Sequence, residues 1–109
     1  MKKLLFGIFV WFSTSSILGQ QEHFNNPILR GGYPDPYICR VGSDYYLVNS
    51  SFEYFPGLPI HHSTDLVNWN LIGHGLHRRT QCTGPMNLVD VQSNGGIHAP
   101  TIRSHDSTF

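Results

Sequence analysis

The stretch "YICRVGSDYYLVNSSF", residues 37–52, decides the fold. It holds two short apolar runs, 37–41 and 45–52, and the second is rich in aromatic and β-branched residues, which favour strands. Gly, Ser and Asp at residues 42–44 have the composition of a short turn. The stretch therefore predicts two strands joined by a hairpin.

Further short strands are predicted along the chain. The segments 60–63, 69–76 and 97–104 have strand-like composition, and stretches rich in Pro, Gly and polar residues separate them. Between the first two, "TDLVNW" (64–69) predicts a tight turn or a single helical turn, in which Asp65 bonds local backbone N–H groups. No helical periodicity runs far enough to predict a helix after the N-terminal segment.

These elements predict an all-β chain. The first four strands form an antiparallel meander, which is the sheet of one propeller blade, and 97–104 begins a second blade that runs into a hairpin turn at 104–109. A single blade has faces and edges that neighbouring blades should cover. We therefore expect the N-terminal part of a longer propeller, inactive and poorly folded as 109 residues alone.

The first 20 residues, "MKKLLFGIFVWFSTSSILGQ", have the order of a secretory signal peptide. Two lysines precede an apolar run over 4–12, and small and polar residues follow up to Gly19. The run is shorter than the roughly 20 residues of a membrane span. The sequence thus predicts a signal peptide over 1–19, a mature domain over 20–109 and a secreted or periplasmic protein. An uncleaved N-terminal anchor is the alternative.

The charge pattern argues against a nucleic-acid partner. Removing residues 1–19 leaves five arginines against seven acids, a net charge of −2 with histidines neutral. No basic stripe is present, and Arg78–Arg79 is an isolated pair typical of a solvated turn. Asn49 begins a glycosylation sequon, but its place inside the predicted strand 45–52 favours coincidence.

The cysteines leave open whether a disulfide forms, and the histidines do not predict a metal site. Cys39 and Cys82 could pair in an exported protein, but Cys39 lies in an apolar run and is better explained as a buried free thiol. His61 and His62 are adjacent, so on a strand they face opposite sides and cannot bind one ion together. None of the seven histidines belongs to a spaced zinc cluster.

The motif "GGYPDPY" (31–37) holds Asp35 between Pro34 and Pro36. The two prolines remove backbone donors and most local freedom, and Pro36 favours an extended backbone at Asp35. Asp35 also stands directly before a strand that we expect to be well buried. Residue types alone leave two interpretations open, a rigid Asx-type turn or an acid aimed at the central channel.

The order of several motifs resembles one family closely. "YPDP", "DYYLVNSSFEYFPG", "STDLVNWNLIG" and "GGIHAPTIR" occur in this order over 26–109. Together they resemble glycoside hydrolase family 43, in its β-xylosidase-like branch. The resemblance implies a five-bladed β-propeller with an axial pocket, and inverting hydrolysis of β-xylosides or α-L-arabinofuranosides. The implied substrate is a xylo- or arabino-oligosaccharide, and the oligomeric state is left open.

The resemblance also implies roles for three residues. Asp35 matches the family's general base, and Phe52 matches an aromatic residue that lines the pocket for the terminal sugar. His98 stands where many relatives carry tryptophan before Ala-Pro, which bears on substrate preference more than on the reaction. An inverting enzyme needs a base and an acid roughly 6.5–9.5 Å apart.

The partner acid is not expected within these residues. In the family, a glutamate acts as the acid and an aspartate tunes it, and both lie in later blades. Four acids of this chain do not match those motifs: Glu22, Glu53, Asp90 and Asp106. The resemblance also implies that any calcium ion on the axis takes its ligands mostly from later blades, so no cofactor is expected in this chain.

Residue types leave three other interpretations open. A carbohydrate-binding or degenerate propeller would keep the pocket and lose the acid. A five-bladed glycosidase acting on fructosides or arabinans is disfavoured by "SSFEYFPG" and "DLVNWNLIG". A structural β module is disfavoured by the rigid Asp35 motif and by the aromatic Phe52.

Overall fold

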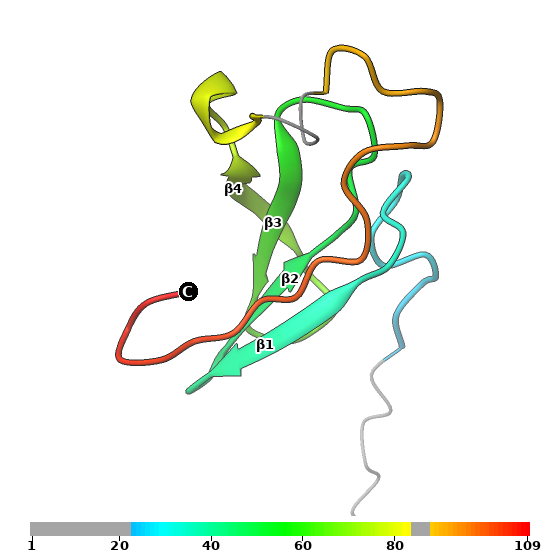
Figure 1. The fold of residues 1–109 in the computed structure, drawn as a ribbon. Coiled ribbons are helices and arrows are strands. Elements are labelled where there is room, and N and C mark those ends of the chain that lie inside the picture. Colours follow the sequence, from blue (N-terminus) through cyan, green and yellow to red (C-terminus); the bar gives the residue numbers. More distant parts are fainter. Residues whose placement is uncertain (1–22, 84–87) are drawn as a thin grey trace, which may run out of the picture.

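The computed structural model describes residues 23–83 and 88–109. These residues form one four-stranded antiparallel sheet with strands in chain order (Figure 1). The strands are β1 (Tyr37–Val41), β2 (Asp44–Val48), β3 (Gly57–Ser63) and β4 (Asn70–Leu76), and a short 3-10 helix, η1 (Arg79–Gln81), follows. The all-β meander of one blade is thus confirmed. The predicted signal peptide, 1–19, lies outside the described residues.

The β1–β2 hairpin forms where its composition predicts. Val41 pairs with Asp44 and Tyr37 pairs with Val48, so the connection is the two residues Gly42 and Ser43. Gly42 has a φ of 62°, a left-handed conformation that glycine adopts without the crowding of a Cβ atom. Asp44 belongs to the strand rather than to the turn.

The other predicted strands differ from the observed ones in length or in kind. The second strand ends at Val48 instead of residue 52, because residues 49–51 turn their side chains and backbone to other segments. The third begins earlier, at Gly57, and the fourth begins at Asn70.

The strand predicted over 97–104 is wrong. Only an isolated bridge between Phe52 and Ile97 forms there. Ala99 then takes a φ of 41°, and Pro100 has no N–H to donate to a ladder, so pairing stops. The turn predicted at 104–109 does form, closed by an isolated bridge between His105 and Thr108.

Within the described residues, the first strand is less buried than expected for a blade inside a propeller. Four of the five residues of β1 are exposed and only Cys39 is half-buried, because β1 is an edge strand that pairs with β2 alone. The buried hydrophobic core of the described residues is small: Leu47, Val48, Leu88, Ile97 and Ile102. Cys39 and Cys82 are both free and half-buried, so Cys39 is less buried than predicted.

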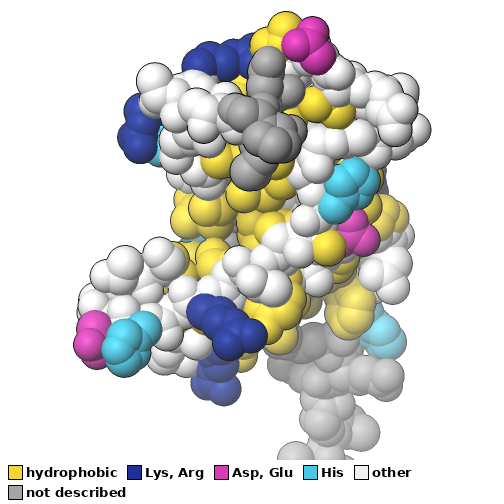
Figure 2. Space-filling model, viewed as in Figure 1, with side chains coloured by type: hydrophobic (Ala, Val, Ile, Leu, Met, Phe, Trp, Pro, Cys, Tyr) yellow, Lys and Arg dark blue, Asp and Glu magenta, His cyan; other side chains and the backbone are white. Residues whose placement is uncertain are grey.

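Large hydrophobic side chains remain at the surface. Leu71 and Ile72 of β4 are 53% and 56% exposed. Figure 2 shows hydrophobic side chains gathered in the middle of one face, with arginines at its margins. Among residues 23–83 and 88–109 there is no helix long and apolar enough to cross a membrane.

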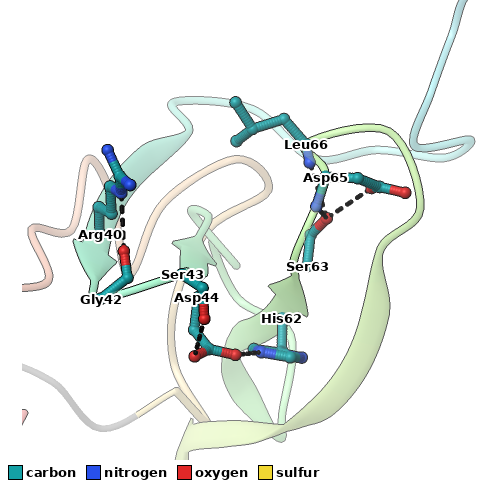
Figure 3. A network of polar contacts seen from close by, with 8 residues as sticks. All are labelled: Arg40, Gly42, Ser43, Asp44, His62, Ser63, Asp65 and Leu66. Carbon is teal, nitrogen blue, oxygen red and sulfur yellow. Dashed lines mark hydrogen bonds and ion pairs between the residues drawn. The ribbon is translucent and has the colours of Figure 1, made fainter.

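The turn after β3 is built from local polar contacts, as predicted for Asp65 (Figure 3). The Ser63 hydroxyl donates to Asp65 Oδ1 at 2.9 Å and accepts the backbone N–H of Leu66 at 2.9 Å. Asp65 Oδ1 also accepts the N–H groups of Val67 and Asn68 at 2.9 and 2.7 Å. These bonds shape the chain between β3 and β4.

Candidate active site

Asp35 lies just before β1, with its backbone in the left-handed region at a φ of 50°. The extended backbone predicted from Pro36 is therefore wrong. Aspartate is one of the few non-glycine residues that enter this region with some ease, since its short side chain can bond locally. Its side chain is exposed, and among the described residues it has one hydrogen-bond donor, the Ser50 hydroxyl.

Ser50 connects Asp35 to a segment far along the chain. Its hydroxyl donates to Asp35 Oδ2 at 2.6 Å and accepts the backbone N–H of Ala99 at 2.7 Å. Its own N–H donates to the carbonyl of Pro34 at 3.1 Å. Ser50 is only 3% exposed, so water competes little for these bonds. Three segments, around 34–35, 50 and 99, thus meet at one side chain.

Asn49 stabilises the same region, in which residues 34–35, 50 and 99 meet and which we call the corner. It is fully buried, and its Nδ2 donates to the carbonyls of Tyr33 and Pro34 at 2.8 and 3.2 Å. These bonds tie the segment before Asp35 to the end of β2. Because Nδ2 is the atom that a glycan would modify, burial and bonding at Asn49 exclude use of the sequon in this folded state.

Phe52 and His98 lie next to this corner. Phe52 N donates to the Ile97 carbonyl at 2.9 Å, and Ile97 N donates back to the Phe52 carbonyl at 3.0 Å. This bridge brings the Phe52 and His98 rings to 4.9 Å between centroids, inclined by 65°. His98 is exposed and Phe52 half-buried, so the pair presents ring surface toward solvent.

Gly96 permits this close approach. A Cβ atom placed on Gly96 would lie 2.3 Å from the Phe52 carbonyl oxygen, and its φ is 90°. Both facts require glycine at this position. The backbone of 96–97 can therefore lie directly against Phe52, and this contact fixes the position of the next residue, His98.

The structure brings all three predicted site residues together. Asp35 and His98 are linked through Ser50 and Ala99, and Phe52 contacts His98. Sequence reasoning missed Ser50 and Ala99. The place of Ser50, two residues before Phe52 in "SSF", was the available signal, but a serine at a predicted strand end has no chemical signature of its own.

A cavity of about 700 Å³ borders the corner. Its wall includes Pro34, Ser50 and Phe52 on the site side. It also includes Tyr54 and Leu71, which are 68% and 53% exposed. Neither Asp35 nor His98 lines it. The cavity therefore adjoins the candidate site through Ser50 and Phe52.

The two adjacent histidines face opposite ways, as expected for a strand. His61 is 2% exposed and packs edge-on against the Tyr33 ring at 4.9 Å, and burial holds its pKa below the usual range. His62 instead bonds Asp44 at 2.6 Å. In the described part of the chain, no three His, Cys, Asp or Glu side chains lie close enough to hold a metal ion.

Comparison with known proteins identifies the family. The model for glycosyl hydrolases family 43 matches residues 24–109. The chain is 53% identical over 106 residues to a non-reducing end alpha-L-arabinofuranosidase of Bacteroides ovatus, covering 97% of this chain and 19% of that protein. It is 48% identical over 84 residues to a beta-xylosidase of Bacillus subtilis, covering 77% and 15%.

Solved structures agree with these relatives. A family 43 protein of Bacillus licheniformis matches with a TM-score of 0.67 and 49% identity, over 76% of this chain and 16% of that one. A xylan beta-1,4-xylosidase of Bacillus halodurans matches with a TM-score of 0.64 and 48% identity, over 77% and 15%.

The chain thus spans about a fifth or less of the length of the proteins it matches. The solved neighbours are β-propeller enzymes, and the four-stranded sheet corresponds to one part of them. With the family model matching most of its residues, the chain belongs to family 43 of the glycosyl hydrolases.

Proposed function

We propose that this chain supplies the general base of an inverting glycosidase that acts on β-xylosides or α-L-arabinofuranosides. The observation that carries the proposal is the state of Asp35. Its carboxylate is exposed, it is held by a single donor among the described residues, and it lies in a corner with two aromatic rings.

The bonding of Asp35 suits a base. One oxygen, Oδ2, is fixed by the Ser50 hydroxyl, and no described residue donates to Oδ1. A base needs an ionised carboxylate with a lone pair within hydrogen-bond reach of the proton it takes. A carboxylate used only to shape a turn would instead have its oxygens occupied by local N–H groups.

The reaction follows from this arrangement. Asp35 takes a proton from a water molecule, whose oxygen forms a bond to the anomeric carbon while the glycosidic C–O bond breaks. An acid on the opposite face of the sugar donates a proton to the leaving oxygen. Because water enters opposite the leaving group, the anomeric configuration inverts, and the two carboxyl groups stand roughly 6.5–9.5 Å apart. We assign the acid to the part of the protein beyond this chain.

Phe52 and His98 are proposed to bind the terminal sugar. Sugar rings present apolar C–H faces that pack on aromatic side chains, and the His98 ring can also donate an N–H to a hydroxyl. Histidine has a smaller face than the tryptophan of many relatives, so we expect weaker stacking and greater dependence on hydrogen bonds. The proposal assigns no residue of this chain to a calcium site.

The substrate class rests on the relatives. The Bacteroides ovatus protein is named for action on non-reducing end α-L-arabinofuranosides, and a Vibrio relative, 49% identical over 84 residues, for xylan 1,3-beta-xylosidase activity. We infer a xylo- or arabino-oligosaccharide substrate met outside the cytoplasm, with 1–19 as the export signal.

The test uses the full-length protein that carries this chain. Asp35→Asn keeps the shape and the acceptor for Ser50 but cannot take the water proton, so we expect kcat on aryl xyloside or aryl arabinofuranoside to fall about a thousandfold. Binding of xylose or arabinose, measured by calorimetry, should persist. Near-normal turnover in Asp35→Asn would reduce Asp35 to a turn residue.

The stereochemistry gives a second readout. Proton NMR of the first-formed sugar should show the configuration opposite to that of the substrate. Retention would contradict the mechanism. Sugar binding without turnover by the unmodified protein would favour a binding propeller instead.

A further inference from the structure

We propose that Ser50 is a positioning residue, which fixes the Asp35 carboxylate relative to the segment carrying His98. The inference rests on the proposed function, because it concerns how the base is held. Ser50 is the one described side chain that bonds both Asp35 and the backbone next to His98. It therefore sets the relation between the base and the sugar-binding ring.

The direction of the Ser50 hydroxyl is fixed by its two partners. The Ala99 N–H can only donate, so Ser50 Oγ must accept from it. The single hydroxyl proton is then directed to Asp35 Oδ2, at the short distance of 2.6 Å typical of a bond to a carboxylate. With Ser50 3% exposed, the bond is shielded from water.

The backbone around Ser50 needs such a restraint. Asp35, Phe52 and Ala99 all have left-handed φ values, of 50°, 49° and 41°. Cβ crowding disfavours this region for Phe and Ala, and Ala99 also precedes a proline, which restricts it further. Left-handed residues persist where surrounding bonds over-determine them. Ser50 bonds two of these three residues directly through its hydroxyl.

Ser51, the next residue along the chain, provides a matched control. It is buried to a similar degree, at 7% exposed, and its hydroxyl has no hydrogen-bond partner among the described residues. Ser51→Ala therefore removes a hydroxyl group from the adjacent residue at similar burial, without breaking a hydrogen bond to Asp35 or Ala99.

The experiment compares Ser50→Ala, Ser50→Thr and Ser51→Ala in the full-length protein, with kcat and KM on an aryl xyloside or aryl arabinofuranoside. We expect Ser50→Ala to lower kcat about 10- to 100-fold with KM changed less than about threefold, because a misaligned base harms the reaction more than sugar binding. Ser50→Thr keeps the hydroxyl and should recover to within about tenfold of the unmodified rate. Ser51→Ala should stay within about twofold.

A second measurement, independent of turnover, reports on the hydrogen bond from the Ala99 N–H to Ser50. Hydrogen exchange at the Ala99 amide should quicken about tenfold or more in Ser50→Ala and stay unchanged in Ser51→Ala. Unchanged exchange in Ser50→Ala would contradict the proposed link to Ala99. Loss of the folded state in Ser50→Ala alone would make Ser50 a structural residue and also overturn the proposal.

The outcomes separate this inference from the proposed function. If Asp35→Asn is inactive while Ser50→Ala keeps a normal kcat, only the role of Ser50 fails. If Asp35→Asn is fully active, the assignment of the base fails and the inference fails with it.

Discussion

Two aspartates in this small chain are held in opposite ways. Asp65, in the turn after β3, receives a hydrogen bond from the Ser63 hydroxyl (Figure 3). It also receives hydrogen bonds from the backbone of Val67 and Asn68 and from the Asn68 side chain. All these donors lie within three residues of it. The donors of Asn68 and then of Val67 hold the pKa of Asp65 well below its usual range.

Asp35 has a single donor among the described residues, and that donor lies 15 residues away. Ser50 in turn bonds Ala99, a further 49 residues along the chain. The difference supports the proposal that Asp65 has a structural role and Asp35 a catalytic one. A carboxylate saturated by neighbours shapes its own turn, whereas one pinned at a single oxygen by a distant residue keeps capacity for a ligand.

The largest expected effect is a reciprocal contrast between these two acids in the full-length protein. Asp35→Asn should lower turnover about a thousandfold and leave the melting temperature nearly unchanged, since asparagine tolerates the left-handed backbone. Asp65→Ala should do the reverse, losing a few degrees of melting temperature because several backbone N–H groups lose their acceptor. Equal losses of activity in both variants would break the comparison.

A second contrast concerns the room for an added Cβ atom at two glycines, Gly96 beside the candidate site and Gly73 in the sheet. In Gly96→Ala, the added Cβ would lie 2.3 Å from the Phe52 carbonyl oxygen, so we expect a loss of roughly 2–4 kcal/mol, together with reduced activity. Gly73→Ala in β4 adds a Cβ with no atom within 4 Å and should be neutral, or stabilising by up to about 1 kcal/mol. Urea unfolding midpoints measure both, and similar midpoints would refute the contrast.

His61 predicts a pH dependence near neutrality. Burial, and then the nearby charge of His74, lower its pKa in the folded protein. The unfolded chain takes up that proton at about pH 6.5, so stability is undiminished above this pH and falls below it. His61→Phe keeps a ring against Tyr33 and should flatten the fall in urea midpoint between pH 7.5 and 5.5. His105→Phe, at a ring 93% exposed, should leave that fall unchanged.

The smallest expected effect lies at the Asp44–His62 pair. The hydrogen bond from His62 lowers the pKa of Asp44. Its stabilisation is therefore present above about pH 4 and is lost as the pH falls below that value. His62→Gln should make the loss of stability between pH 5 and 3 shallower, and added salt should shrink the difference, because the pair is partly exposed to solvent. An unchanged slope would mean that the pair contributes nothing.

The features that the sequence predicts best are those determined by residues close together in the chain. The β1–β2 hairpin, the order of four strands and the role of Asp65 in its turn all follow from residues within a few positions of one another, and the structure confirms them. The second strand differs from its prediction only at its end, where Asn49 and Ser50 leave the ladder and bond distant segments.

What depends on distant segments was predicted less well. The left-handed backbone of Asp35 contradicts the local effect of Pro36 and is sustained by Ser50 and Asn49. The strand predicted over 97–104 is wrong because Ala99 bonds a side chain instead of a ladder. The candidate roles of Asp35, Phe52 and His98 rest on the order of the motifs, whereas no residue type in the sequence indicates the two hydrogen bonds that connect Asp35 to Ala99 through Ser50.

The link from Ala99 to Ser50 has a consequence for the order of folding. A contact between residues 49 positions apart must bear the entropy of closing a long loop, whereas the Ser63–Asp65 turn closes within three residues. The turn should therefore form early and the corner late. During synthesis, the Asp35 carboxylate is not fixed in place until the Ala99 segment has emerged and docked, so the sheet forms before the proposed site is complete.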